Sequence, residues 1–272
     1  MPITCTIENK IAEIVFDVPP VNAFNSETWM SLPDIITAAG KNPDVNCVLI
    51  RAEGRGFCGG VDIKEMQAHP ERITILKALG AELVLTDPLE GSDGAILKAR
   101  EMAAENPDLY WYANQYNNAA NWQAHYLSTG HEIFAQTNGL VTHFITGLGT
   151  SGTLMGTGRY LRDQLPDVKI LAFQPDAPFH GLEGLKHMPS AIKPGIYDES
   201  VAGTPLEVQT EAAHEMVNRL AREEGLFVGI SSGAAAVAAL QVASELDEGV
   251  VVTLFPDAGY KYLSDKKLWE GK

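Results

Sequence analysis

Residues 142–175 have the sequence THFITGLGTSGTLMGTGRYLRDQLPDVKILAFQP, and this stretch decides the fold class. A strand-forming stretch at 142–147 precedes a loop rich in glycine and hydroxyl groups. An amphipathic stretch then leads to a second strand-forming stretch at 168–174. This order predicts a strand, a tight turn, a helix and another strand. Because the connection is a single helix, we expect the two strands to be parallel neighbours in an α/β sheet.

The glycine-rich loop, residues 147–157, predicts an anion site. Small residues let the backbone turn tightly, so that successive N–H groups point at one anion, and the following helix adds its positive end. Thr150, Ser151 and Thr153 add hydroxyl donors. The string GLGTSG also satisfies the weak dinucleotide pattern G-x-G-x-x-G, for which Asp176 would be the acidic partner. A strand-to-helix turn without any ligand is the plainer alternative.

The alternation of strands and helices continues on both sides of this unit. Further helices are predicted at 72–80, 93–105, 121–137, 207–225 and 233–246, and further strands at 82–86, 109–116, 227–230 and 250–256. Nearer the N-terminus, the pattern predicts a hairpin from 3–7 and 11–17, a helix at 26–40 ended by Gly40, and a buried strand at 47–52. Alternation with short links predicts a mostly parallel sheet with helices on both faces.

The bulk composition excludes several classes of protein. The 272 residues include 20 basic and 35 acidic side chains, a net charge of −15, which disfavours nucleic acids and anionic membrane surfaces as partners. Cys5, Cys47 and Cys58 form no paired motif, so neither a disulfide scaffold nor a metal site is expected. No apolar run approaches the roughly 20 residues that span a bilayer. We therefore expect a cytoplasmic protein.

Residues 72–269 resemble the later part of cysteine synthase and related pyridoxal-phosphate enzymes, including cystathionine β-synthase. The segments LKALGAELVLTD, NQYNNAAN, GLGTSGT, FHGLEGLKHM, LAREEGLFVGISSGAA and VVTLFPDAGYKYLS follow the order of that family. The resemblance implies fold-type II architecture, pyridoxal 5′-phosphate as cofactor and a homodimer. It also implies a transferase or lyase that makes cysteine from an O-acetylserine-type amino acid and a sulfur nucleophile.

The same resemblance implies roles for particular residues. The cofactor phosphate would be held by Gly149, Thr150, Ser151, Gly152 and Thr153. Ser231 would face the pyridine nitrogen, where a neutral hydroxyl suits β-elimination and replacement. Gln115 would lie near the substrate carboxylate, and Gly181 and Gly184 would border the substrate pocket.

The family's cofactor-binding lysine lies early in its chain, in a segment like SxKDR. Lys10, Lys41 and Lys64 are the only lysines among residues 1–71, and none has that context. Since this lysine binds the cofactor covalently and also serves as acid and base, we assign no catalytic residue and expect activity to be impaired by several decades.

Residues 3–68 resemble the N-terminal part of the crotonase superfamily, which includes enoyl-CoA hydratase. The resemblance rests on AEIVFDVPPVNAFN and NPDVNCVLIRAEGRGFCGGVDIKEM. It implies that the backbone N–H of Val61 is one of two donors to a thioester enolate and that Gly60 lets an acyl-CoA approach closely. It also implies a trimer-based assembly. The second donor and the acid/base carboxylates of that family have no counterpart after residue 68.

The two resemblances divide the chain into residues 1–70, a crotonase-like fragment, and residues 71–272, a cysteine-synthase-like region. Four hypotheses stay open. The chain is an impaired β-replacement enzyme, a non-catalytic protein that holds pyridoxal phosphate or an acyl-CoA, a non-functional fusion, or a crotonase-type hydratase or isomerase fragment.

Overall fold

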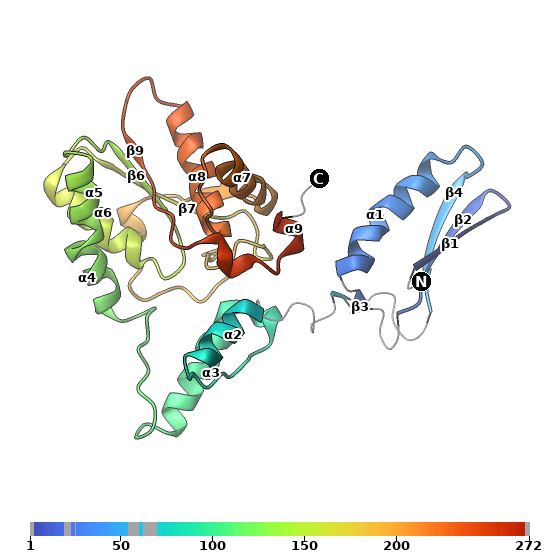
Figure 1. The fold of residues 1–272 in the computed structure, drawn as a ribbon, viewed down its shortest axis with the longest axis horizontal. Coiled ribbons are helices and arrows are strands. Elements are labelled where there is room, and N and C mark those ends of the chain that lie inside the picture. Colours follow the sequence, from blue (N-terminus) through green and yellow to red (C-terminus); the bar gives the residue numbers. More distant parts are fainter. Residues whose placement is uncertain (1–2, 19–22, 25, 54–59, 62–69, 270–272) are drawn as a thin grey trace. The chain divides into compact units, whose positions relative to one another are not determined.

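The computed structural model describes residues 3–18, 23–24, 26–53, 60–61 and 70–269. These residues form two compact units. Unit 1 takes in the described residues up to 61 together with 87–91, and unit 2 takes in the remainder (Figure 1). No helix in the described part of the chain is long and apolar enough to cross a membrane.

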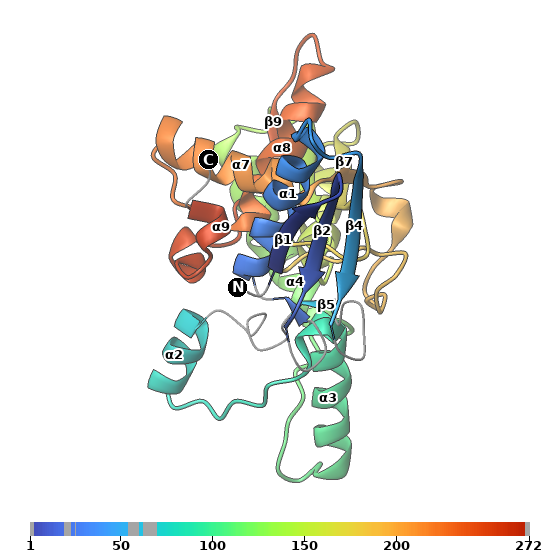
Figure 2. The same ribbon diagram turned by 90° about the vertical axis from the view of Figure 1, so that its right-hand side faces the viewer.

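Unit 1 contains a three-stranded sheet in the order β1-β2-β4 (Figure 2). Its elements are β1 (Ile3–Glu8), β2 (Ile11–Phe16), β4 (Cys47–Ala52) and the helix α1 (Ser26–Lys41). β1 and β2 are antiparallel, and β2 and β4 are parallel. Asn9 and Lys10 join the first two strands with φ values of 51° and 65°, the pattern of a two-residue type I′ turn. The predicted hairpin is confirmed, and α1 runs one residue past Gly40.

One face of this sheet packs against its own small core. Ala12, Ile14 and Phe16 alternate along β2, as period-two side chains on one face must, and all three are buried. The strand predicted at 47–52 is confirmed as β4, but the prediction that it is buried is wrong. β4 lies at the sheet edge, its residues alternate between exposed and half-buried, and Leu49 is 48% exposed.

Unit 2 is built on four parallel strands in the order β8-β7-β6-β9. They are β6 (His143–Gly147), β7 (Lys169–Pro175), β8 (Leu206–Val208) and β9 (Val251–Val252). The helix α6 (Gly152–Gln164) connects β6 to β7, which places His143 beside Lys169. The predicted strand–turn–helix–strand unit and its parallel pairing are therefore confirmed.

Helices cover both faces of this sheet. One side carries α6 with α4 (Ala119–Leu127) and α5 (Thr129–Gln136), and the other carries α7 (Thr210–Glu223) and α8 (Ile230–Ser244) (Figure 1). Adjacent strand residues point to opposite faces. Accordingly, Phe144 packs in one core cluster with Leu154, whereas Ile145 packs in another with Val217. The predicted fold class, a mostly parallel sheet between two helical layers, is confirmed.

Three predicted strands are wrong. Residues 82–86 and 109–116 are irregular, because the described part of the chain offers them no strand to form a ladder with. At 227–230, Val228 makes an isolated bridge to Ala258, and α8 begins two residues later. The helix predicted at 121–137 is divided at Ser128 into α4 and α5.

The remaining elements are short or flank unit 2. They are α2 (Pro70–Ala78), α3 (Gly91–Glu105), α9 (Lys266–Trp269), the pair β3 (Ala23–Phe24) and β5 (Gly60–Val61), and three 3₁₀ turns, η1 (Pro88–Glu90), η2 (Glu199–Val201) and η3 (Gly259–Tyr262). α2 and α3 confirm the helices predicted at 72–80 and 93–105.

Candidate functional site

A cavity of about 670 Å³ opens in unit 2 at the carboxyl ends of its strands. Gly147 at the end of β6 and Phe173 near the end of β7 line it, together with the loop that enters α6. This position is where open α/β sheets bind their ligands. The predicted residues that line it are Gln115, Gly149, Thr150, Ser151, Gly152, Thr153, Gly184 and Ser231.

The loop from 149 to 153 has the features of an anion cradle. Ser151 adopts a left-handed backbone with φ of 68°, and its side chain is 2% exposed. Its Oγ has no hydrogen-bond partner among the described residues. Gly152 N–H donates to Thr150 Oγ1 at 3.2 Å. A buried hydroxyl without a partner, beside the positive end of a 13-residue helix, fits a phosphate group.

The first turn of α4 and the segment before it contact this loop. A Cβ at Gly152 would lie 1.8 Å from Asn121 Oδ1, so any larger residue there would have to displace the Asn121 side chain. The side-chain amide of Asn121 donates to the backbone carbonyl oxygen of Gln115 at 2.7 Å. Asn118 caps α4 by accepting from Ala120 N–H at 3.0 Å. One asparagine-rich turn therefore places both the cradle and Gln115.

Ser231 lies in the first turn of α8 and is 7% exposed. The backbone just before it is packed tightly, since a Cβ at Gly229 would lie 1.9 Å from Asp257 Oδ1. Asp257 accepts a hydrogen bond from the Tyr262 hydroxyl at 2.8 Å. Burial, followed by the Asp257 charge, raises the pKa of Tyr262 well above its ordinary value. Ser231 thus faces the cavity beside a network of polar groups.

Two cations of the lining were missed by the sequence reasoning. Arg72, on α2, pairs with Glu183 at 2.8 Å and lies 4.7 Å from the centroid of the Tyr262 ring. Lys261, on η3, has its Nζ 3.8 Å from Asp257 Oδ2. Lys261 is the single lysine among the described lining residues. Arg72 and Lys261 are far from the glycine-rich loop in the chain. No sequence pattern therefore linked these two residues to the loop.

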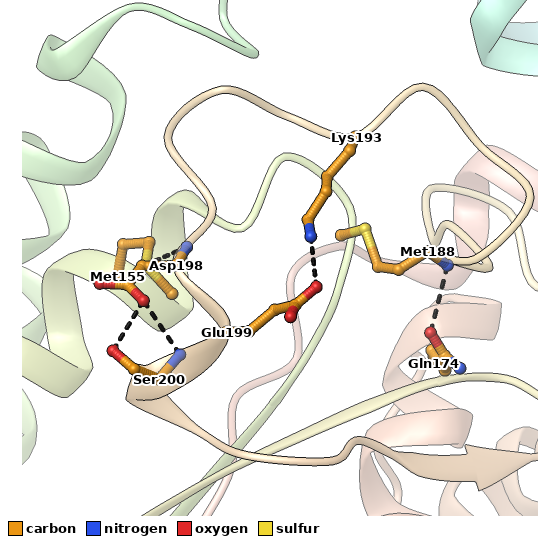
Figure 3. Close-up of polar contacts among 7 residues, drawn as sticks. All are labelled: Met155, Gln174, Met188, Lys193, Asp198, Glu199 and Ser200. Atoms are coloured by element: carbon orange, nitrogen blue, oxygen red, sulfur yellow. Dashed lines mark hydrogen bonds and ion pairs between the residues drawn. The ribbon is translucent and has the colours of Figure 1, made fainter.

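Gly181 and Gly184 differ in position. Gly184 lines the cavity, whereas Gly181 is absent from the described lining and its N–H donates to Thr210 Oγ1 at 2.9 Å. The long loop 176–205 that carries both is tied to the sheet and to α6 (Figure 3). Met188 N–H donates to Gln174 Oε1 at 3.1 Å, and Asp198 N–H contacts Met155 Sδ at 3.4 Å.

Within the same loop, Lys193 pairs with Glu199, and Asp198 accepts hydrogen bonds from both the N–H and the hydroxyl of Ser200 (Figure 3). These hydrogen bonds from Ser200 hold the pKa of Asp198 below its ordinary value. Residues 188–200 of the loop are therefore held by contacts within the loop and with β7 and α6.

In unit 1, Gly60 and Val61 form β5, which pairs in parallel with β3. Residues 54–59 and 62–69, which carry most of the GRGFCGGVDIKEM string, lie outside the described residues. The predicted acyl-CoA site and its oxyanion donor at Val61 stay predictions.

Residues 64–257 match the family model of pyridoxal-phosphate dependent enzymes. The match covers most of the chain, and the chain belongs to this family. Residues 6–84 match the enoyl-CoA hydratase/isomerase family model. The chain therefore carries two stretches, each similar to a different enzyme family. The longer stretch, residues 64–257, contains most of the residues that line the cavity.

Cysteine synthases are prominent among its relatives. The cysteine synthase of Aquifex aeolicus is 54% identical over 198 residues, which cover 71% of this chain and 61% of that protein. Cysteine synthase B of Pseudomonas aeruginosa is 40% identical over 194 residues, covering 71% of this chain and 64% of that protein. The chain thus spans about three fifths of the length of these relatives.

A solved cysteine synthase from Entamoeba histolytica has a TM-score of 0.68 and 25% identity, covering 98% of this chain and 84% of that one. The fold is therefore that of a fold-type II pyridoxal-phosphate enzyme. The family and these relatives indicate pyridoxal phosphate as the cofactor.

Proposed function

We propose that this chain binds pyridoxal phosphate in the cavity of unit 2, and that its cysteine-synthase-like β-replacement activity is impaired. The proposal rests on one observation, that three features lie together in one cavity. These are the buried Ser151 hydroxyl without a partner among the described residues, the amino end of α6, and Ser231 in the first turn of α8. They suit a ligand with a phosphate at one end and a hydrogen-bond acceptor at the other.

Each group then has a separate task. The backbone and hydroxyls from Gly149 to Thr153 hold the phosphate through hydrogen bonds that need no lysine. The Ser231 hydroxyl would donate a hydrogen bond to the pyridine nitrogen of the cofactor. Because the hydroxyl is uncharged, it would not stabilise a proton on that nitrogen. Gln115, whose carbonyl is fixed by Asn121, contacts the carboxylate of an amino-acid substrate. When bound, pyridoxal phosphate supplies an electron sink for amino-acid carbanions.

The expected impairment rests on residues 1–71 of this chain. In this chain the early residues match a different enzyme family, and Lys10, Lys41 and Lys64 have no context like the cofactor lysine. Lys261 lines the cavity, but its Nζ is already near the Asp257 carboxylate. Without a positioned amine, the acid/base steps of β-replacement slow by several decades.

The test is a titration of the purified full chain with pyridoxal phosphate, followed by borohydride treatment and peptide mapping. Saturable binding with no single trapped lysine, and no cysteine formed from O-acetylserine and sulfide, is the expected result. A stoichiometric adduct on one lysine with turnover would overturn the impairment. No binding would overturn the proposal and leave a non-functional fusion.

Two matched variants test whether pyridoxal phosphate binds at Ser151. Ser151→Gly removes the hydroxyl but suits the left-handed backbone, and we expect affinity for pyridoxal phosphate to fall about tenfold. Ser244→Ala removes a hydroxyl that hydrogen-bonds only locally, to the Gln241 carbonyl, and should leave affinity unchanged.

A further inference from the structure

We propose that His125 is a positioning residue for the anion cradle. Its imidazole sets the direction of the Thr153 hydroxyl, so that the Thr153 hydrogen points into the cavity toward a bound phosphate. This inference rests on the proposed function, because it assigns a task to a residue behind the same phosphate site.

Three side chains contact one another in succession, Thr129, His125 and Thr153. His125 Nε2 lies 3.4 Å from Thr153 Oγ1, and His125 Nδ1 lies 2.9 Å from Thr129 Oγ1. In the described lining of the cavity Thr153 is present and His125 is not. His125 therefore acts on a cavity ligand through Thr153 rather than by direct contact.

The packing of α4 against α6 keeps the imidazole in this position. A Cβ at Gly156 would lie 2.0 Å from the Trp122 carbonyl oxygen and 2.7 Å from His125 Cβ. The two helices approach so closely that only glycine fits between them. On the opposite side of His125, Thr129 occupies the first residue of α5 and contacts Nδ1.

The ring can carry its single proton on either nitrogen, and the two arrangements have opposite effects. With the proton on Nε2, the ring donates to Thr153 Oγ1 and the Thr153 hydrogen is free for an anion. With the proton on Nδ1, the ring accepts that hydrogen and withdraws it from the cavity. A phosphate in the cradle favours the first arrangement. Burial lowers the pKa of His125, which favours the neutral ring. The neutral ring carries one proton, on either Nδ1 or Nε2.

The experiment is a double-mutant cycle on ligand affinity. The full chain and its variants His125→Phe, Thr153→Val and the combination of both are titrated with pyridoxal phosphate and with pyridoxal, which lacks the phosphate. We expect each single change to weaken pyridoxal phosphate binding about tenfold and the combination to weaken it no more than Thr153→Val alone. Affinity for pyridoxal should not change.

A pair of conservative variants separates positioning from folding. His125→Gln places an amide near the site of Nε2 and should restore affinity to within about threefold, whereas His125→Asn is too short and should not. Circular dichroism of each variant checks that the helices are retained.

The outcomes distinguish the two proposals. Losses that add in the double variant, or equal losses for pyridoxal and pyridoxal phosphate, overturn the role of His125 while leaving the cofactor site standing. Failure of the unaltered chain to bind pyridoxal phosphate overturns the site itself, and the positioning role with it.

Discussion

Gly149 and Gly184 meet backbone to backbone at the cavity. A Cβ at Gly149 would lie 2.5 Å from the carbonyl oxygen of Gly184, closer than any real contact allows. This approach joins the anion loop to the loop 176–205, so the two segments are placed by each other. The proposed phosphate site and the predicted substrate border therefore meet at two residues without side chains.

The first prediction follows from this contact. Gly149→Ala forces one backbone away from the other, and we expect a loss of about 1–3 kcal/mol in the free energy of unfolding, with much weaker pyridoxal phosphate binding. Gly40→Ala is the control, because nothing lies within 4 Å of a Cβ there and alanine favours a helix. Urea unfolding and ligand titration measure both variants. Equal behaviour of the two would contradict the importance of this contact.

A second prediction concerns the far end of the cavity. Ser231→Ala removes the hydroxyl that we propose contacts the ring nitrogen, and we expect pyridoxal phosphate affinity to fall about tenfold. Ser232→Ala changes the adjacent residue, which is fully buried, lies outside the described lining and has its Oγ 3.5 Å from the Asp257 carbonyl. It should leave affinity unchanged. If only Ser232→Ala weakened binding, the placement of the ring nitrogen near Ser231 would be wrong.

A third prediction concerns a buried ion pair between α3 and the loop 176–205. Lys186 is 3% exposed and pairs with Asp93, which also accepts Ile192 N–H at 2.7 Å. Asp93→Asn leaves a buried ammonium without its counter-charge, and we expect a loss of about 3–5 kcal/mol in the free energy of unfolding.

The matched control for that prediction is the exposed pair of Lys193 and Glu199 in the same loop, whose side chains are 51% and 67% exposed. Glu199→Gln should cost no more than about 1 kcal/mol, because water screens the pair. Denaturant unfolding compares the two variants, and similar costs would refute the importance of burial here.

A fourth prediction concerns pH. Burial lowers the pKa of His125 and of His180 below the ordinary value of 6.5, with His187 adding to the effect at His180. Below that value the unfolded chain binds more protons than the folded chain, so the free energy of unfolding falls as the pH falls through it. Because both rings are only half-buried, we expect less than about 1 kcal/mol for each.

Urea midpoints measured at about pH 7.5 and pH 5.5 test this slope, with His125→Gln as the comparison. The variant should show a smaller decrease, because glutamine does not titrate. An unchanged slope in the variant would show that His125 keeps its ordinary pKa in the folded chain.

Much of unit 2 could be predicted from local sequence. The apolar runs at β6 and β7 and the glycine-rich turn between them determine the strand–turn–helix–strand unit without reference to the rest of the chain. The hairpin of unit 1 follows in the same way from alternating residues around Asn9 and Lys10. These elements form wherever their own pattern and turn chemistry are sufficient.

The predicted strands at 82–86 and 109–116 show the limit of this reasoning. Both have residues that favour strands, yet a strand exists only when a neighbour accepts and donates its hydrogen bonds. Leu85 is 58% exposed and Trp111 is 84% exposed in the irregular segments that result. Propensity is local, whereas pairing depends on which segment arrives alongside.

The amino-acid sequence by itself determined the class of fold and the family, and it predicted an anion loop, since these depend on patterns within continuous segments of the chain. Only the tertiary structure placed Arg72 and Lys261 in the lining of the same cavity and His125 behind Thr153. Their positions depend on helix packing and on contacts between segments far apart in sequence, such as Gly149 with Gly184. Such contacts are decided by the shapes that pack together, and no local pattern records them.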